Sequence, residues 1–381
     1  MMSTRLCPLV LSAALVAAIA SGTPAAAQPS GNAAEARRPR ASVPTQSPEV
    51  AADGKVTFRL RAAKAMEVLV AGQWGGEPVA MTKGEGDVWS VTVGPISPGV
   101  WEYSFRVDGL QMIDPGNPAI KPMREPRTSI LHIPGQPPLV HDFQAVPHGV
   151  VHSHSYFSKS LGRLRELAVY TPPGYDQQAD ARFPTLYLQH GSGDNQATWV
   201  VHGKAHWILD NLIAQGKAKP MVIVMMDGHA GDRSATGPQG NTGAFERDLL
   251  EDVMPFVEAN YRVKTDAASR CIAGLSMGGG QSLTIGLNHL DRFAWVAGFS
   301  SSAPSREAVA GVLDNPVAAN EKLKLLWIAC GKDDFLLKRN EEFVSLLKEK
   351  DIQHEWHLTE GNHSWPVWRI YLADLAPKLF K

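Results

Sequence analysis

The sequence predicts an α/β protein: a mostly parallel β-sheet covered by helices on both faces, preceded by a smaller all-β segment. Two observations support this prediction. From about residue 148 to residue 381, short apolar runs alternate with stretches of helical periodicity, which is typical of parallel strands joined by crossover helices. From about residue 49 to residue 134, apolar and polar residues alternate at a period of two, and turn signals recur at short intervals.

The first residues have the pattern of a secretory signal peptide, residues 1–27. Arg5 supplies a positive charge, an apolar run follows over residues 9–20, and Ala25-Ala26-Ala27 is a small-residue cleavage site. That run is too short to cross a bilayer as a helix. We therefore expect an exported protein, secreted or periplasmic, with no membrane association after cleavage. Residues 28–48, rich in Ala, Pro, Ser and Arg without periodicity, are predicted to be a flexible linker.

The all-β segment, residues 49–134, is predicted to be a small immunoglobulin-like β-sandwich, because strand patterns alternate with turns such as Asp108-Gly109. Trp101, Tyr103 and Phe105 share one face of a strand and are expected in its core. Trp74, in a turn, is the candidate for an exposed ring that stacks on sugar. The alternative is a packing domain that shapes the entrance of the site. Pro-rich residues 135–147 are the predicted junction to the next domain, residues 148–381.

The α/β segment is organised around the run Gly274-Leu275-Ser276-Met277-Gly278. An apolar strand precedes this G-x-S-x-G motif and a helix follows it, which is the context of a nucleophile elbow in the α/β-hydrolase fold. The two glycines allow close packing around the serine. We predict that Ser276 is a nucleophile and that the Met277 N–H, at the start of a helix, is an oxyanion donor.

The other elements follow in chain order. Strands are predicted at residues 164–170, 183–189, 221–226, 293–299, 325–330 and 354–358. Helices are predicted at residues 206–216, 245–261 and 339–350 and from about residue 366, and Pro255 predicts a kink or a local break in the second of them. Residues 228–243, with five glycines, are a candidate for a mobile loop near the site.

A serine nucleophile needs a histidine base and an acid, in the chain order Ser, acid, His for this fold. Of the thirteen histidines, His363 lies in a loop after the last predicted strand. Asp333 and Asp334 both follow the strand at residues 325–330, and spacing does not separate them. Ser192, in the turn after an earlier strand, is the candidate for the second oxyanion N–H, although this segment also has the pattern of a simple tight turn.

Neither a metal nor a cofactor is predicted, because no carboxylate or cysteine cluster accompanies the closely spaced His152 and His154. Cys271 and Cys330 lie on strands expected to be two strand spacings apart, roughly 9–10 Å, which is too far for a disulfide. We predict buried free thiols. A net charge of −1 without a basic stripe indicates no nucleic-acid partner. Oligomeric state is not predicted.

Two sets of sequence runs resemble known families. The first set comprises residues 167–175, 186–191, 208–214, 245–250, 261–263, 274–280, 331–334 and 361–368. By these runs, residues from about 150 to 381 resemble carbohydrate esterase family 1, which contains feruloyl and acetylxylan esterases and is related to esterase D. The second set comprises residues 56–60, 70–74, 89–93, 98–103, 107–109 and 114–117. By these runs, the all-β segment resembles the family-48 carbohydrate-binding modules.

The resemblance implies roles for particular residues. The catalytic acid of the family, the fourth residue of a Gly-x-x-Asp turn, falls on Asp334, and the first oxyanion amide falls on Ser192. Trp199 and Trp365 are candidates for pocket walls around a flat aromatic acid; the alternative places both in the core. Asn362 stands where many relatives have glycine.

The implied function is that of an exported serine esterase that cleaves acyl esters on plant cell-wall polysaccharide such as xylan. Feruloyl or hydroxycinnamoyl is the expected acyl group. The alternatives are an acetylxylan esterase and a siderophore esterase acting on catecholate esters. A non-catalytic carbohydrate-binding protein is the alternative from another class, and the complete set of Ser276, Asp334 and His363 argues against it.

Overall fold

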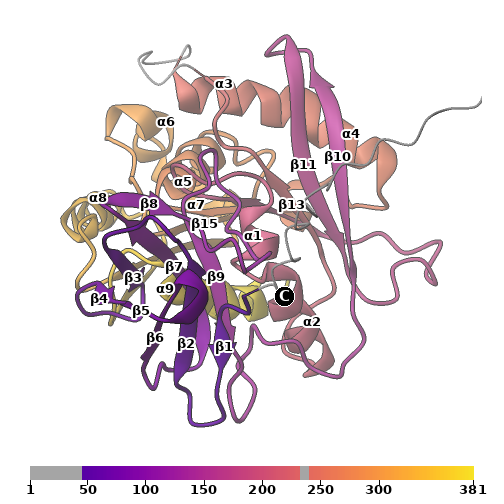
Figure 1. Cartoon of the computed structure of the whole chain (residues 1–381). Helices are drawn as coiled ribbons and strands as arrows, with labels where there is room; N and C mark the ends of the chain where they lie inside the picture. The colour runs from indigo at the N-terminus through magenta and orange to yellow at the C-terminus, as the bar shows by residue number, and fades with distance from the viewer. Residues whose placement is uncertain (1–44, 232–239) are drawn as a thin grey trace, which may run out of the picture. The chain divides into compact units, whose positions relative to one another are not determined.

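The computed structural model describes residues 45–231 and 240–381. The predicted signal peptide and most of the predicted linker lie outside these ranges, as does part of the glycine-rich stretch at residues 228–243. Residues 44–381 form one compact unit, in which an antiparallel β-segment (residues 49–133) is followed by an α/β-segment (residues 150–378) (Figure 1). None of the helices within the described ranges combines the length and the hydropathy needed to span a bilayer.

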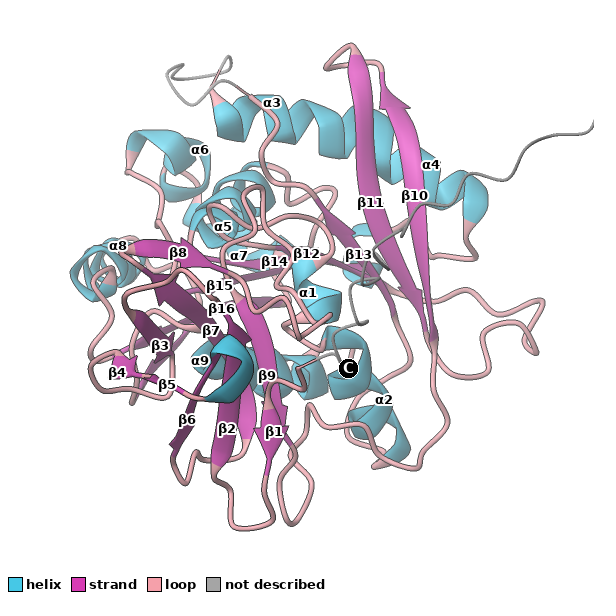
Figure 2. Cartoon of the chain, viewed as in Figure 1, coloured by secondary structure: helices cyan, strands magenta, loops and turns pink. Residues whose placement is uncertain are grey.

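Two antiparallel sheets make up the β-segment (Figure 2). The first has the order β1-β2-β6-β5, with bounds Glu49–Val50, Val56–Arg61, Val88–Val93 and Thr82–Lys83. The second has the order β4-β3-β7-β8, with bounds Val79–Ala80, Val68–Gly72, Gly99–Val107 and Leu110–Met112, and β9 (Ser129–Ile133) also pairs with β7. A short 3-10 turn, η1 (Glu85–Asp87), precedes β6.

Residues from both of these sheets share one hydrophobic core. Phe58 of the first sheet meets Tyr103 and Phe105 of the second, and all three side chains are buried. The period-two pattern places Tyr103 and Phe105 on the same face of β7, as expected. Trp74, the candidate for an exposed ring, is instead half-buried, because its ring stacks on Phe58 with the ring centroids 5.6 Å apart.

An eight-stranded sheet in the order β10-β11-β13-β12-β14-β15-β16-β17 forms the centre of the α/β-segment. The bounds of these strands, in chain order, are Val150–Ser158, Arg163–Thr171, Thr185–Gln189, Val222–Met226, Arg270–Leu275, Trp295–Phe299, Leu325–Gly331 and Glu355–Thr359. The six strands from β12 onward are parallel to their neighbours among them, and β10 and β11 are antiparallel. The prediction of a mostly parallel sheet is therefore confirmed, while strand β10 was not predicted.

Helices cover both faces of this sheet, and the alternation of side chains along each strand creates two cores. On one face, Ile272 and Ile328 pack with side chains from the helices α5 and α8. On the other face, Ala273 and Trp327 pack with side chains from α2 and α9. The helices are α1 (Thr198–Val201), α2 (Ala205–Ala214), α3 (Asn241–Arg247), α4 (Met254–Asn260), α5 (Met277–Asn288), α6 (Ala310–Leu313), α7 (Pro316–Lys322), α8 (Leu337–Glu349) and α9 (Trp365–Leu375).

The predicted helix at residues 245–261 is longer than expected and is interrupted. It begins with α3, continues through a π-helical stretch, η3 (Asp248–Val253), and ends with α4. Pro255 lies in the first turn of α4, where its missing N–H and its ring prevent a regular α-helical bond to the preceding turn. The predicted break near Pro255 is therefore confirmed. Short 3-10 turns, η4 (Ala267–Ser269), η5 (Glu307–Val309) and η6 (Ala376–Lys378), complete the segment.

The two cysteines of this segment are buried and free, as predicted. Cys271 lies in β14 and Cys330 in β16, with β15 between them in the sheet. Burial, and to a lesser extent the nearby Asp334 carboxylate, raises the pKa of the Cys330 thiol to about 12.

Candidate active site

Ser276 lies at the sharp turn between β14 and α5. Its backbone has φ 54° and ψ −116°, in the left-handed half of conformational space that a non-glycine residue rarely adopts. Two backbone hydrogen bonds hold Ser276 in this strained conformation. The Ser276 N–H donates to the Phe299 carbonyl at 2.9 Å, and the Ser302 N–H donates to the Ser276 carbonyl at 2.9 Å.

The glycines that flank the serine allow this close packing. A Cβ atom at Gly274 would lie 2.6 Å from the carbonyl group of Gly278, and one at Gly278 would lie 2.3 Å from the His190 carbonyl oxygen. Both distances are too short for a real Cβ atom, so the G-x-S-x-G spacing is a requirement of the fold at this turn.

The structure brings Ser276, His363 and Asp334 together in one hydrogen-bonded chain. His363 lies in the loop between β17 and α9, and its Nε2 is 3.0 Å from Ser276 Oγ. Its Nδ1 is 2.9 Å and 3.0 Å from the two carboxylate oxygens of Asp334. Because an ionised carboxylate only accepts, Nδ1–H is the donor, and the unprotonated Nε2 can accept the hydroxyl proton of Ser276.

Asp334, rather than its neighbour Asp333, is the acid that contacts His363. The Asp334 side chain is buried, and Asp333 is exposed. Burial alone would raise the pKa of the Asp334 carboxyl, but hydrogen bonds from His363 and from the Leu336 N–H, the latter at 2.8 Å, outweigh it and lower that pKa below its usual value. Asp334 therefore remains ionised near neutral pH.

Two segments with backbone N–H groups lie beside Ser276. Met277 is the first residue of α5. The first α-helical hydrogen bond of this helix runs from the Gly280 N–H to the Ser276 carbonyl. The N–H groups of residues 277–279 therefore lack a carbonyl acceptor from an earlier turn of the helix. Gly191 lies against the nucleophile, since a Cβ atom built on it would be 3.3 Å from Ser276 Cβ. Ser192 follows Gly191 and is exposed. The predicted oxyanion donors, Met277 and Ser192, are thus both on segments next to the hydroxyl.

Trp199 and Trp365 are both buried in the core of the protein. Their exposed fractions are 1% and 2%, and their rings contact each other edge to face with centroids 4.9 Å apart. Trp199 Nε1 donates to the Gln189 carbonyl at 2.9 Å. This burial supports the core alternative over pocket walls, because both rings fill space between the loop after β12 and the start of α9.

Phe335 is a residue of this site that sequence reasoning missed. Its side chain is 76% exposed, and its ring centroid is 4.3 Å from that of His363. The available signal was a large aromatic residue directly after a candidate acid, in a loop where nothing in the pattern buries it. An exposed aromatic ring next to the base is a surface on which a flat ligand can pack.

Two neighbouring hollows open beside these residues. One, of 1250 Å³, is lined in part by Met277, and the other, of 650 Å³, is lined in part by Phe335. Pro304, Ser305 and Arg339 line both, so the two hollows adjoin. Together they form a long depression that extends from Met277, the residue after Ser276, to Phe335, the residue after Asp334.

The described ends of the glycine-rich stretch at residues 228–243 contact the site, although residues 232–239 lie outside the described ranges. Asn241 Nδ2 donates to the Gly228 carbonyl at 2.9 Å and lies 3.5 Å from the sulfur of Met277. These described ends are therefore anchored next to one of the predicted oxyanion donors.

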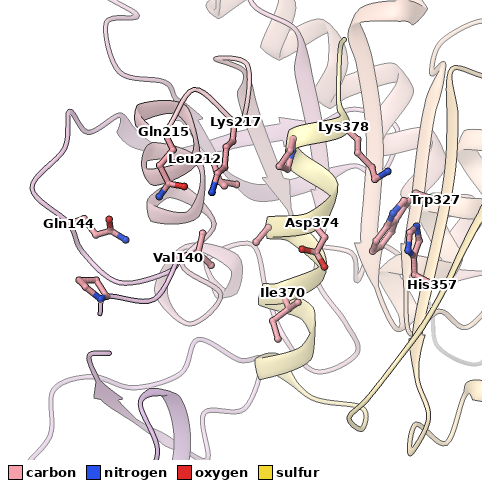
Figure 3. Close-up of a pocket in the computed structure, with 13 residues that line it drawn as sticks. Val140, Gln144, Leu212, Gln215, Lys217, Trp327, His357, Ile370, Asp374 and Lys378 are labelled. Carbon is pink, nitrogen blue, oxygen red and sulfur yellow. The ribbon is translucent and has the colours of Figure 1, made fainter. Parts of the chain in front are cut away.

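Another pocket, of 720 Å³, lies away from these residues (Figure 3). Ile370 and Asp374 of α9 line it, with Leu212 of α2 on one side and Trp327 and His357 on the other. None of the predicted site residues lines this pocket, so it is separate from the site around Ser276.

Comparisons with known proteins place this geometry in context. The family model Esterase matches residues 158–379. The chain is 33% identical over 346 residues to an endo-1,4-beta-xylanase/feruloyl esterase of Xylanibacter ruminicola; this match covers 88% of the chain but only 46% of the relative, so the chain spans about half of that relative's length.

The solved structures that are similar to this chain include two esterases. A ferulic acid esterase is 28% identical with a TM-score of 0.54, covering 60% of this chain and 97% of its own. The enterobactin esterase of Shigella flexneri is 20% identical with a TM-score of 0.59, covering 86% and 93% of the two chains, and shows similarity of fold alone.

Proposed function

The chain belongs to the Esterase family, with an α/β-hydrolase catalytic domain, and from this premise we propose that it is a serine esterase that hydrolyses feruloyl and related hydroxycinnamoyl esters on plant cell-wall polysaccharide such as xylan. The observation that supports this most directly is the hydrogen-bonded chain from Ser276 through His363 to Asp334. The similarity to a xylanase/feruloyl esterase and to a ferulic acid esterase supports the choice of acyl group.

The reaction proceeds by acyl transfer in two steps. His363 Nε2 accepts the proton of Ser276 as its Oγ attacks the ester carbonyl, and the Asp334 carboxylate stabilises the imidazolium that forms. The N–H groups of Met277 and Ser192 stabilise the oxyanion of the tetrahedral intermediate. The sugar alcohol leaves with the proton from His363, and a water activated by the same nitrogen then hydrolyses the acyl-enzyme.

Phe335 and the long depression support a substrate larger than an acetyl ester. The exposed Phe335 ring beside His363 offers an aromatic face for the hydroxycinnamoyl group. The larger hollow, 1250 Å³, exceeds the range of roughly 300–1,000 Å³ that is usual for small-ligand pockets. It therefore has room for sugar units of the polysaccharide next to the scissile ester.

The N-terminal part is included in the proposal. Residues 1–27 are a signal peptide that directs export, residues 28–48 a linker, residues 49–134 an immunoglobulin-like sandwich similar to carbohydrate-binding modules, residues 135–147 a junction, and residues 148–381 the esterase domain. The match to the Xylanibacter relative covers 88% of this chain, which supports a two-domain unit as the functional enzyme.

Parallel assays of the purified protein on methyl ferulate, acetylated xylan and a catecholate ester test this proposal, with Ser276→Ala as the control. We expect the fastest hydrolysis with methyl ferulate and none by the variant. Preferential release of acetate would instead indicate an acetylxylan esterase, and preferential cleavage of the catecholate ester a siderophore esterase. A folded protein that hydrolyses no ester, with Ser276 unlabelled by an organophosphonate, would refute the assignment as an enzyme.

A further inference from the structure

A buried ion-pair cluster joins the β-segment to the loop that contains Ser192. Lys121, which lies between β8 and β9, is only 6% exposed. Its Nζ is 3.0 Å from the Glu102 carboxylate, on β7, and 3.0 Å from the Asp194 carboxylate, in the loop after β12. Both carboxylates are buried as well. A buried ammonium group is costly unless it is paired, so each member of the cluster depends on the others.

Backbone contacts run alongside this cluster. The Arg124 N–H donates to the Gly193 carbonyl at 2.9 Å, and Met123 pairs with Asp194 as an isolated antiparallel bridge. The Thr198 hydroxyl donates to the Pro122 carbonyl at 2.7 Å. Residues 121–124 of the β-segment therefore dock on Gly193 and Asp194, directly after Ser192, and on Thr198.

The same loop contacts the nucleophile at its other end. Gly191 packs against Leu275 and Ser276, so the loop lies between the elbow and the β-segment. Among the described residues, Lys121 is the cation that forms an ion pair with Asp194. Lys121 Nζ also lies over the ring of Trp365, 5.8 Å from the ring centroid. Trp365 is two residues after His363 in the sequence.

We propose that Lys121 is a positioning residue for the oxyanion hole: by holding Asp194 it fixes the loop that presents the Ser192 N–H. This inference rests on the proposed function, in which Ser192 is an oxyanion donor. It makes the β-segment a part of the catalytic machinery, in addition to any contact that it makes with polysaccharide. Because the oxyanion exists only in the transition state and the intermediate, displacing the loop lowers kcat and leaves KM largely unchanged.

The test compares Lys121→Met with Arg127→Met as a matched control, since Arg127 is an exposed cation close to Lys121 in the same segment. Removal of a whole oxyanion donor costs about 100-fold to 1,000-fold in kcat, and displacement of one costs less, so we expect about a 10-fold to 100-fold loss for Lys121→Met. The substrates are methyl ferulate and 4-nitrophenyl acetate, and KM is expected to stay within about threefold. The inhibition constant of a phenylboronic acid, a mimic of the tetrahedral intermediate, is expected to rise in step with the loss in kcat.

Arg127→Met is expected to match the wild type, and Lys121→Arg, which keeps the ion pairs, is expected to retain most of kcat. If Lys121→Met does not fold, Asp194→Asn replaces it, because that change removes the pairing from the loop side and predicts the same loss. A folded Lys121→Met protein with unchanged kcat and unchanged boronate affinity would overturn the inference while leaving the proposed function intact. A wild-type protein that cleaves 4-nitrophenyl acetate but not methyl ferulate would overturn only the assignment of the acyl group. A wild-type protein that cleaves neither substrate would overturn both the proposed function and the inference about Lys121.

Discussion

Replacement of Asp334 with asparagine changes one atom of the hydrogen-bonded chain and leaves the size of the side chain unchanged. In the structure, Asp334 Oδ1 accepts from the Leu336 N–H at 2.8 Å, and Oδ2 is 2.9 Å from His363 Nδ1. The Leu336 N–H requires an acceptor, so the carbonyl oxygen of the new amide takes the Oδ1 position. Its NH₂ group then faces His363 Nδ1 and donates to it.

The effect of this substitution on the rate follows from the tautomer of His363. When Nδ1 accepts from the amide, the neutral ring carries its proton on Nε2, and Nε2 can no longer accept the proton of Ser276 at 3.0 Å. The equivalent change in a serine protease lowers kcat by about 10,000-fold. At 1.36 kcal/mol per factor of ten, this is about 5.5 kcal/mol of transition-state stabilisation. We expect a loss of this order for Asp334→Asn, with KM nearly unchanged.

Steady-state hydrolysis of methyl ferulate measures this loss, and Asp333→Asn is the matched control because it makes the same change on an exposed side chain one residue away. The control is expected to stay within about twofold of the wild type, since substitution of an exposed side chain usually changes the free energy of folding by no more than about 0.5 kcal/mol. If Asp333→Asn loses activity and Asp334→Asn retains it, the assignment of the acid and the argument from the tautomer are both refuted.

Three further predictions concern the two cysteines, Trp365 and Phe335. Cys271 and Cys330 should not react with a thiol reagent at about pH 8 in the folded protein, because both are buried and a pKa of about 12 leaves roughly one thiolate in 10,000 at Cys330. Both thiols should react in denaturant. Rapid reaction in the folded state would contradict their burial. Trp365→Ala should lower the free energy of unfolding by about 3–5 kcal/mol, measured by denaturant titration, as expected for a buried Trp, and a loss within about 0.5 kcal/mol would mean that the ring is not core. Phe335→Ala should raise KM for methyl ferulate about 2-fold to 10-fold, the loss of one aromatic contact of about 0.5–1.5 kcal/mol, with no change for 4-nitrophenyl acetate; equal effects on both substrates would exclude a contact with the aromatic acyl group.

Elements with a strong local signal were predictable from the sequence. The apolar runs of the parallel strands β12 to β16 are buried on both faces, so their pattern is unambiguous, and the G-x-S-x-G motif fixes the turn at Ser276. Strand β10 was missed because it lies at the edge of the sheet, and its partly buried residues, His152 and His154, alternate with the exposed Ser153 and Ser155. A strand with so few buried side chains gives a weak pattern, and its pairing with β11 is decided by tertiary structure.

Burial of individual aromatic residues was not predictable in the same way. Trp365 lies two residues after His363 and Phe335 directly after Asp334, yet Trp365 is buried and Phe335 is 76% exposed. Proximity in sequence indicates which loop a residue occupies, but not the direction of its side chain. That direction depends on neighbours such as Trp199, which is distant in the sequence and fills the space on one side of Trp365.

The division between the predictable and the unpredictable parts of the site has a topological cause. In a parallel sheet the carboxyl ends of all strands meet at one edge, so residues that follow β12, β14, β16 and β17 converge without further information. Ser276, Asp334 and His363 come from three of these ends, and Ser192 comes from the fourth. Lys121 reaches the same edge from an antiparallel segment whose position relative to the sheet is not determined by strand order. It depends on side-chain contacts between residues more than seventy positions apart, such as Lys121 and Asp194. The residues that perform the proposed chemistry thus follow from the fold, whereas the residue that we infer to hold the oxyanion loop follows only from the docking of one segment on the other.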